Sequence, residues 1–167
     1  MWGRGSERRA HGGGTFLQAA LAVVVVVLAV GGADGTTVRC PPKCLCFRTT
    51  VRCMFLGLKR IPHVPVRTTI LDLRFNKIRS IPPNHFKDLK HLHTLLLNNN
   101  HITRLQNTTF TGLESLRYLY LYKNRIRIIE KGVFKNLSNL EQLYLHFNKI
   151  VKLPTDVFSS LNRLQRL

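Results

Sequence analysis

The chain repeats one phrase four times, as LDLRFNKI at residues 71–78, LLLNNNHI at 95–102, LYLYKNRI at 119–126 and LYLHFNKI at 143–150. The phrases share the pattern L-x-L-x-x-N-x-I, and their asparagines, Asn76, Asn100, Asn124 and Asn148, follow one another at intervals of 24 residues. Leucines at alternate positions of a strand point to the same face, so each phrase predicts one short strand with a buried face. The constant period predicts that these strands stack into one continuous array.

The phrase and its period are typical of a leucine-rich repeat solenoid, in which each unit spans about 20–29 residues. We therefore expect an α/β fold in which short parallel strands form a curved sheet with an irregular convex side. The predicted repeats cover residues 68–91, 92–115, 116–139 and 140–163, and residues 164–167 begin a fifth repeat. Terminal repeats normally need a polar cover, so we expect a fragment that exposes its last apolar layer and tends to associate.

The asparagine column has a physical explanation in the sharp turn that follows each predicted strand. Backbone groups at this turn are hidden from water, and an amide side chain can both donate and accept hydrogen bonds. We therefore expect each asparagine to satisfy backbone groups of its own repeat and of the adjacent one. Removing one asparagine would leave buried groups unpaired, at a cost of roughly 1–3 kcal/mol.

Residues 1–33 have the features of a secretory signal peptide. Arg4, Arg8 and Arg9 make a basic start, Phe16–Val30 is an apolar run, and small residues precede an expected cleavage after Ala33. The alternative is an uncleaved membrane anchor, but the run is short for a bilayer span, which needs about 20 residues. We therefore expect a secreted protein with no stable membrane span after cleavage.

Residues 34–67 contain all four cysteines, Cys40, Cys44, Cys46 and Cys53, with the spacing C-x3-C-x-C-x6-C. An even cluster of cysteines after a secretory signal indicates disulfides, and four cysteines allow three pairings. A zinc site is the competing interpretation, but the spacing does not fit the common zinc motifs. The cluster resembles the N-terminal cap of extracellular leucine-rich repeat proteins, and this resemblance implies the pairs Cys40–Cys46 and Cys44–Cys53.

Two N-glycosylation sequons, Asn107-Thr-Thr and Asn136-Leu-Ser, lie in the segments that return from one strand to the next. A bulky glycan is tolerated there because these segments lie away from the strand face. We therefore expect both asparagines to be glycosylation sites.

The residues that alternate with the buried leucines are expected to form an open concave face. All four tyrosines of the chain fall on this face, together with a histidine and a phenylalanine of the fourth repeat. The set consists of Tyr118, Tyr120, Tyr122, Tyr144, His146 and Phe147. Exposed aromatic clusters are typical of protein–protein contacts, which favours a binding surface. The alternative is that the rings merely pack on one another.

The chain is strongly basic, with 26 Lys+Arg against 8 Asp+Glu, and loss of residues 1–33 would leave a net charge of +16. Part of the excess recurs in the loop after each strand, at Lys77, Arg79, Arg104, Arg125, Arg127, Lys149 and Lys152. Stacking would align these residues as a basic ridge, which attracts polyanions in a salt-dependent way. In a secreted protein we expect heparan sulfate or an acidic matrix protein as the partner, and no nucleic acid. A solvated basic rim is the alternative.

No catalytic or cofactor-binding motif stands out in the sequence. The seven histidines show no metal-ligand spacing, and there is no nucleophile elbow, phosphate loop or pair of carboxylates. We therefore expect the chain to have no enzymatic activity of its own, no metal and no cofactor.

Five phrases carry a more specific resemblance: CLCFRTTVRCM at 44–54, ILDLRFNKIR at 70–79, TLLLNNNHI at 94–102, YLYLYKN at 118–124 and EQLYLHFNKI at 141–150. They resemble the N-terminal repeats of the peroxidasin family, and the resemblance covers residues 40–167. It implies a secreted protein of the extracellular matrix, whose repeats precede immunoglobulin-like domains and a haem peroxidase domain that cross-links collagen IV. That peroxidase domain, with its haem and calcium, has no counterpart in this sequence, so the resemblance implies matrix-protein binding here.

A second interpretation is that the chain is the N-terminal part of a leucine-rich repeat cell-surface receptor or of a Slit-like guidance protein. Sequence beyond Leu167 separates the two, because immunoglobulin and peroxidase domains support the first interpretation and a transmembrane helix supports the second.

Overall fold

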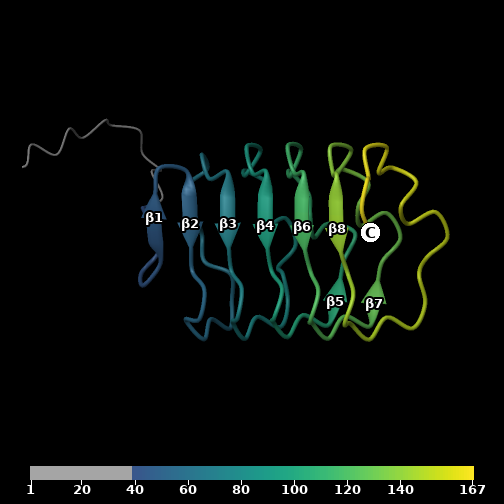
Figure 1. Cartoon of the computed structure of the whole chain (residues 1–167), viewed down its shortest axis with the longest axis horizontal. Coiled ribbons are helices and arrows are strands. Elements are labelled where there is room, and N and C mark those ends of the chain that lie inside the picture. Colours follow the sequence, from purple (N-terminus) through teal and green to yellow (C-terminus); the bar gives the residue numbers. More distant parts are fainter. Residues whose placement is uncertain (1–38) are drawn as a thin grey trace, which may run out of the picture. The chain divides into compact units, whose positions relative to one another are not determined.

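The computed structural model describes residues 39–167, so the predicted signal peptide at 1–33 lies outside the described residues. Short strands joined by turns and loops make up this part of the chain (Figure 1). The strands are β1 (Leu45–Phe47), β2 (Thr50–Arg52), β3 (Ile70–Asp72), β4 (Thr94–Leu96), β5 (Arg104–Leu105), β6 (Tyr118–Tyr120), β7 (Ile128–Ile129) and β8 (Gln142–Tyr144). Residues 39–167 contain no helix, and thus no apolar helix long enough to cross a bilayer.

Six of the strands form one sheet in the order β1-β2-β3-β4-β6-β8. β1 and β2 pair in antiparallel orientation, and every later pair is parallel. The register follows the repeat period, because Leu71 pairs with Leu95 and Leu95 pairs with Leu119. A parallel bridge between Gln142 and Arg166 starts the fifth repeat in the same register. The predicted solenoid of stacked parallel strands is confirmed.

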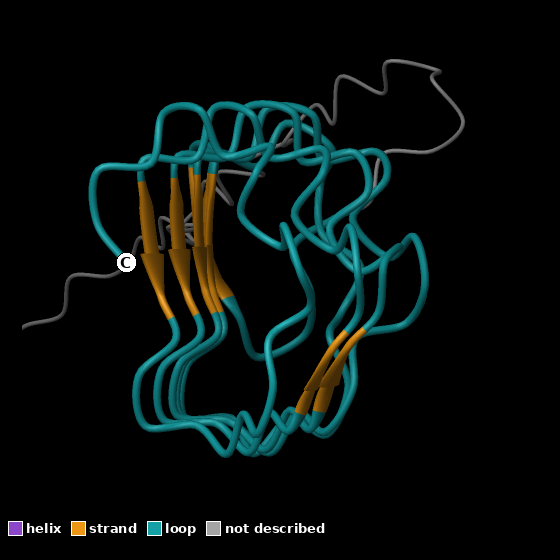
Figure 2. Ribbon diagram, turned by 90° about the vertical axis from the view of Figure 1, so that its right-hand side faces the viewer, coloured by secondary structure: helices purple, strands orange, loops and turns teal. Residues whose placement is uncertain are grey.

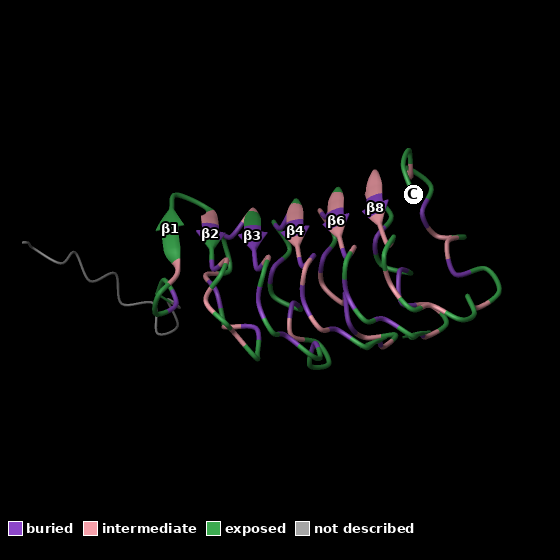
Figure 3. Ribbon diagram, turned by 60° about the horizontal axis from the view of Figure 1, so that its bottom comes forward, coloured by how far each residue is buried: buried purple, intermediate pink, exposed green. Residues whose placement is uncertain are grey.

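Buried residues recur on the strands and on the return segments of successive repeats (Figure 3), and apolar side chains at matching positions form columns. The column behind the sheet includes Phe86, Phe110 and Phe134, all of which are completely buried. The rings of Phe110 and Phe134 stack with centroids 6.0 Å apart, and those of Phe134 and Phe158 stack with centroids 5.9 Å apart. From Phe110 onward each ring thus packs on its counterpart one repeat away, which explains why one repeat cannot bury its own apolar face.

Asparagine side chains connect consecutive repeats at the turn after each strand. The Asn100 amide donates to the carbonyl of Leu73 in the preceding repeat at 2.9 Å and to that of Leu97 in its own at 3.1 Å. Its Oδ1 accepts from the backbone N–H of Ile78 at 3.1 Å. The other three asparagines of the column bond in the same way. The expectation that they join adjacent repeats is confirmed.

The residue before each of these asparagines adopts a left-handed backbone conformation. The φ angle is 56° at Phe75, 57° at Asn99, 53° at Lys123 and 54° at Phe147. This conformation costs a residue with a side chain about 1–2 kcal/mol. It turns the chain sharply inward after the strand, and the hydrogen bonds of the following asparagine offset its cost.

The convex side is irregular, as expected, except for one short second sheet. β5 and β7 pair in parallel across from the main sheet (Figure 2). The remaining return segments run through successive turns in which an N–H donates to the carbonyl three residues earlier, as from Leu89 to Phe86 and from Leu92 to Leu89. The α/β class implies helices on this side. Residues 39–167 have none, and turns take their place on the return segments.

Two disulfides lie in the cap that precedes the first repeat. They join Cys40 to Cys46 and Cys44 to Cys53, with Cα atoms 5.9 Å and 4.5 Å apart. These are the pairs implied by the resemblance to extracellular caps, and the zinc interpretation is wrong because no described cysteine is free. Cys53 is fully buried and β2 pairs with β3, so the cap covers the first strand of the repeats.

Replacing Asn100 by alanine should lower the free energy of unfolding by about 1–3 kcal/mol, because the buried N–H of Ile78 loses its partner. The carbonyls of Leu73 and Leu97 each lose one of two amide donors and keep the other, from Asn76 and Asn124. The control Asn162→Ala lies at an exposed turn position and should change this free energy by less than about 0.5 kcal/mol. Urea denaturation followed by circular dichroism measures both variants. Equal effects of the two substitutions would contradict the bridging role of Asn100.

Candidate interaction surfaces

The outward face of the main sheet carries the six aromatic residues predicted to form a binding surface. The structure places them on β6, on β8 and in the turns directly after these strands: Tyr118, Tyr120, Tyr122, Tyr144, His146 and Phe147. Of the leucines between them, Leu119, Leu121 and Leu143 are buried and Leu145 is half-buried, whereas each of the six is at least partly exposed. We call these six residues the aromatic face.

Two ring stacks that cross from the third repeat to the fourth make the aromatic face continuous. The rings of Tyr120 and Tyr144 stack with centroids 4.9 Å apart, and those of Tyr122 and His146 stack with centroids 4.7 Å apart. Phe147, which is 70% exposed, meets the edge of His146 at 5.2 Å. Burial raises the pKa of Tyr120, so its hydroxyl remains a hydrogen-bond donor at neutral pH. The rings do pack on one another, and they also keep surface that is open to solvent.

Cationic side chains flank the aromatic face. The Arg117 guanidinium lies 5.6 Å from the centre of the Tyr118 ring, and Lys123 Nζ lies 5.9 Å from that of Phe147. Arg117 also donates to Glu141 at 2.8 Å, which offsets its charge. The face therefore combines electron-rich rings with nearby positive charge.

The outward face of the first repeat carries an ion pair flanked by the exposed apolar side chains of Ile70 and Phe75, and this pair was not predicted from the sequence. Arg74 donates two hydrogen bonds to the Asp72 carboxylate, from Nε to Oδ1 at 2.9 Å and from Nη2 to Oδ2 at 2.7 Å. The Asp72 side chain is only 4% exposed, and its hydrogen bond raises the pKa of Arg74. The sequence does contain a cue for this pair. Asp72 and Arg74 have opposite charges and are two residues apart, so their side chains point to the same face of the strand.

Asn98 occupies the same register position as Arg74 in the previous repeat and Tyr122 in the next one. It is 1% exposed, and neither its Nδ2 nor its Oδ1 has a protein partner. A sequence pattern could not reveal this, because the neighbouring Asn100 has the same chemistry and is fully hydrogen-bonded. Buried amide atoms without a partner cost stability.

The seven residues predicted as the basic ridge are all exposed. They are Lys77, Arg79, Arg104, Arg125, Arg127, Lys149 and Lys152. The segments that carry them run along the lower edge of Figure 2, from the main sheet toward β5 and β7. Backbone hydrogen bonds of 2.9 Å from Arg125 to Ile102 and from Lys149 to Ile126 keep successive repeats aligned here. The three ion pairs within residues 39–167 involve no ridge residue.

The two predicted glycosylation sites, Asn107 and Asn136, are exposed. Both lie on return segments, away from the strands that carry the aromatic face. The Asn107 backbone N–H donates to the Glu130 carboxylate at 3.1 Å. This hydrogen bond uses the backbone of Asn107 and not its side-chain amide, to which a glycan would be attached. Their modification stays a prediction.

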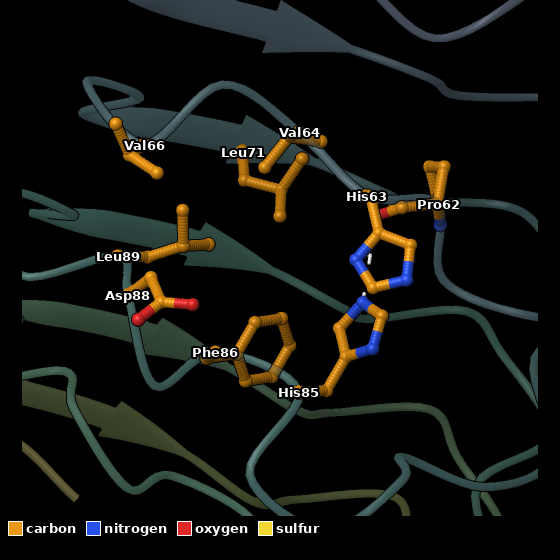
Figure 4. Close-up of a pocket in the computed structure, with 9 residues that line it drawn as sticks. All are labelled: Pro62, His63, Val64, Val66, Leu71, His85, Phe86, Asp88 and Leu89. Atoms are coloured by element: carbon orange, nitrogen blue, oxygen red, sulfur yellow. Dashed lines mark hydrogen bonds between the residues drawn. The ribbon is translucent and has the colours of Figure 1, made fainter. Parts of the chain in front are cut away.

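A small hollow near the cap brings two histidines together (Figure 4). The rings of His63 and His85 lie with centroids 5.0 Å apart, and His85 Nε2 lies 3.4 Å from the carbonyl of Pro62. Burial lowers the pKa of His85, and the neighbouring His63 lowers it further. Within residues 39–167 no three metal-binding side chains come close enough to hold an ion, so this pair lacks the ligands of a structural zinc site.

Asn98→Leu should raise the free energy of unfolding by about 1–2 kcal/mol, because a side chain of similar volume removes two buried polar atoms without protein partners. The matched change Asn100→Leu should lower it, since those polar atoms are bonded. Thermal unfolding of the two variants measures the difference. Destabilisation of both by a similar amount would show that the Asn98 amide is satisfied in solution.

Comparison with known proteins agrees with this architecture. The family described as "Leucine rich repeat" matches residues 67–126 and 120–167. A crystal structure of a TLR13–ssRNA13 complex is similar with a TM-score of 0.56 and 32% identity, covering 57% of this chain and 14% of that chain.

Several curated relatives match over short segments. Human "Probable oxidoreductase PXDNL" is 67% identical and human "Peroxidasin homolog" 63% identical, each over 60 residues, or 36% of this chain and 4% of the relative. Decorin from Gallus gallus is 49% identical over 59 residues, or 35% of this chain and 16% of decorin. The match thus spans only a small part of each relative. Because the repeat family covers more than half of the sequence, the chain belongs to the leucine-rich repeat family.

Proposed function

We propose that the chain is a secreted, protein-binding module of the extracellular matrix, without catalytic activity of its own. The aromatic face is the observation that carries this proposal. The similarity to peroxidasin supports the matrix setting, and it is confined to the repeats. The name of one relative describes it as a probable oxidoreductase. The residues that match this chain make up only 4% of that relative, so its activity is not carried over.

The proposal includes the processing expected for such a protein. Cleavage of residues 1–33 would place the chain in an oxidising compartment, in which disulfides such as Cys40–Cys46 and Cys44–Cys53 persist. Glycans on Asn107 and Asn136 would project from return segments. The outward face of the sheet would then remain accessible to a partner.

The aromatic face has the physical properties of an energetic centre for protein binding. Tyrosine and histidine rings bring large contact area with few rotatable bonds, so little side-chain entropy is lost on binding. The stacks of Tyr120 on Tyr144 and of Tyr122 on His146 fix the rings further before a partner arrives. Such preorganised aromatic clusters are where binding energy concentrates in protein interfaces.

Collagen IV, on which the peroxidase domain of the resembled family acts, is the matrix protein used as the probe. Tyr122→Ala/His146→Ala should weaken binding to it by about tenfold or more. The reason is that the double variant removes one complete stack from the aromatic face. Biolayer interferometry on immobilised collagen IV measures the dissociation constant. The control Lys87→Ala/Lys135→Ala changes exposed residues of the return segments and should bind like the wild type. Unchanged binding by the aromatic variant would overturn this assignment of the face.

A second function rests on a separate observation, the exposed basic ridge, which forms no ion pair within residues 39–167. We propose that it binds a sulfated polysaccharide of the heparan sulfate type. Aligned cations on consecutive repeats match a polymer that carries anionic groups at regular intervals. Such binding should weaken as salt rises, because released counterions contribute to it.

Arg125→Glu/Arg127→Glu should elute from a heparin column at clearly lower salt than the wild type, because it reverses charge in the middle of the ridge. Lys87→Glu/Lys135→Glu makes the same change in net charge on the return segments and should elute much closer to the wild type. Salt-gradient chromatography of the three proteins decides the matter. Equal shifts for both variants would show that net charge, and not the ridge, retains the chain.

A further inference from the structure

One histidine interrupts the basic ridge. His101 stands in the same register position as Lys77, Arg125 and Lys149, each 24 residues from the next. The alignment is physical, because the His101 N–H donates to the Ile78 carbonyl at 2.9 Å, as the Arg125 N–H does to the Ile102 carbonyl. His101 therefore lies within the row of the basic ridge, and the charge of its imidazole depends on pH. The seven lysines and arginines that define the ridge in the sequence do not include it.

The groups that face His101 are cationic. Arg125 comes from the following repeat, and Lys77 and Arg79 come from the preceding one. Within the described residues, 39–167, the charges that shift the pKa of this imidazole include no acidic group. Desolvation lowers the pKa of His101 below 6.5, and these three cations lower it further. The imidazole is thus neutral at pH 7.5, which leaves an uncharged position between Lys77 and Arg125.

We propose that His101 makes polysaccharide binding by the ridge proton-dependent, so that the ridge holds sulfated chains more tightly at mildly acidic pH. This inference rests on the proposed polyanion-binding function. Neighbouring parallel strands lie about 4.8 Å apart, so Lys77 and Arg125 are separated by about 10 Å of ridge with His101 between them. A protonated His101 imidazole adds a third positive charge between Lys77 and Arg125. This charge lies next to a sulfate group that these two residues bind.

The direction of the pH effect follows from the charges. A bound sulfate offsets the three cations that disfavour the imidazolium, so the pKa of His101 rises on binding. Binding therefore takes up a proton, and affinity increases as the pH falls from about 7.5 toward about 5. A single additional surface charge contact corresponds to an increase of about two- to fivefold in affinity.

Heparin is the probe for this inference. Its dissociation constant is measured by isothermal titration calorimetry at pH 7.5, 6.5 and 5.5, at constant ionic strength, for the wild type, His101→Gln and His101→Lys. His91→Gln is the control, because His91 is exposed and precedes β4, whereas the ridge follows the strands. The control corrects for the general gain in positive charge that all histidines bring at low pH.

The wild type and His91→Gln should gain about two- to fivefold more affinity between pH 7.5 and 5.5 than His101→Gln does. His101→Lys should bind about two- to fivefold more tightly than the wild type at pH 7.5, and it should lose the same part of the pH dependence as His101→Gln. Equal pH dependence in the wild type and His101→Gln would overturn the role of His101 and leave the ridge proposal intact. Absence of heparin binding at every pH would overturn the ridge proposal itself.

Discussion

The fold depends on the hydrogen bonds that each turn asparagine makes to two repeats at once. The strand must be followed by an inward turn, and that turn carries a left-handed residue and buries backbone carbonyls. An amide side chain is the group that can satisfy a carbonyl on each side and still accept from an N–H, as Asn100 does. Because the bond to the previous repeat fixes the register, the leucine and phenylalanine columns then stack without offset.

The same register decides what the surface can do. Outward side chains at equivalent positions of neighbouring strands lie next to one another across the sheet. The surface therefore changes from repeat to repeat, from an ion pair between Asp72 and Arg74 to stacked rings of Tyr120 and Tyr144. The basic ridge follows the strands and occupies a different edge of the same repeats. A protein on the aromatic face and a polysaccharide on the ridge would therefore occupy separate surfaces.

Periodic features of this molecule could be predicted from the sequence, and features that depend on side-chain geometry could not. The spacing of the asparagines predicts the repeats, the strand register and the asparagine bridges, and the cap resemblance implies both disulfide pairs. The orphaned amide of Asn98 was missed, because it differs from Asn100 only in which backbone groups come within reach. His101 was missed as part of the ridge since its charge, unlike that of lysine or arginine, depends on its neighbours.

The small sheet formed by β5 and β7 has a consequence for how the second and third repeats meet. In most curved arrays, adjacent units are wedge-shaped, because the side opposite the sheet is wider than the sheet itself. Here both walls hold parallel strand pairs, whose spacing is about 4.8 Å on either side. The two walls therefore advance by about the same distance between these two units, which limits the bending of the array at the point where it leads into the aromatic face.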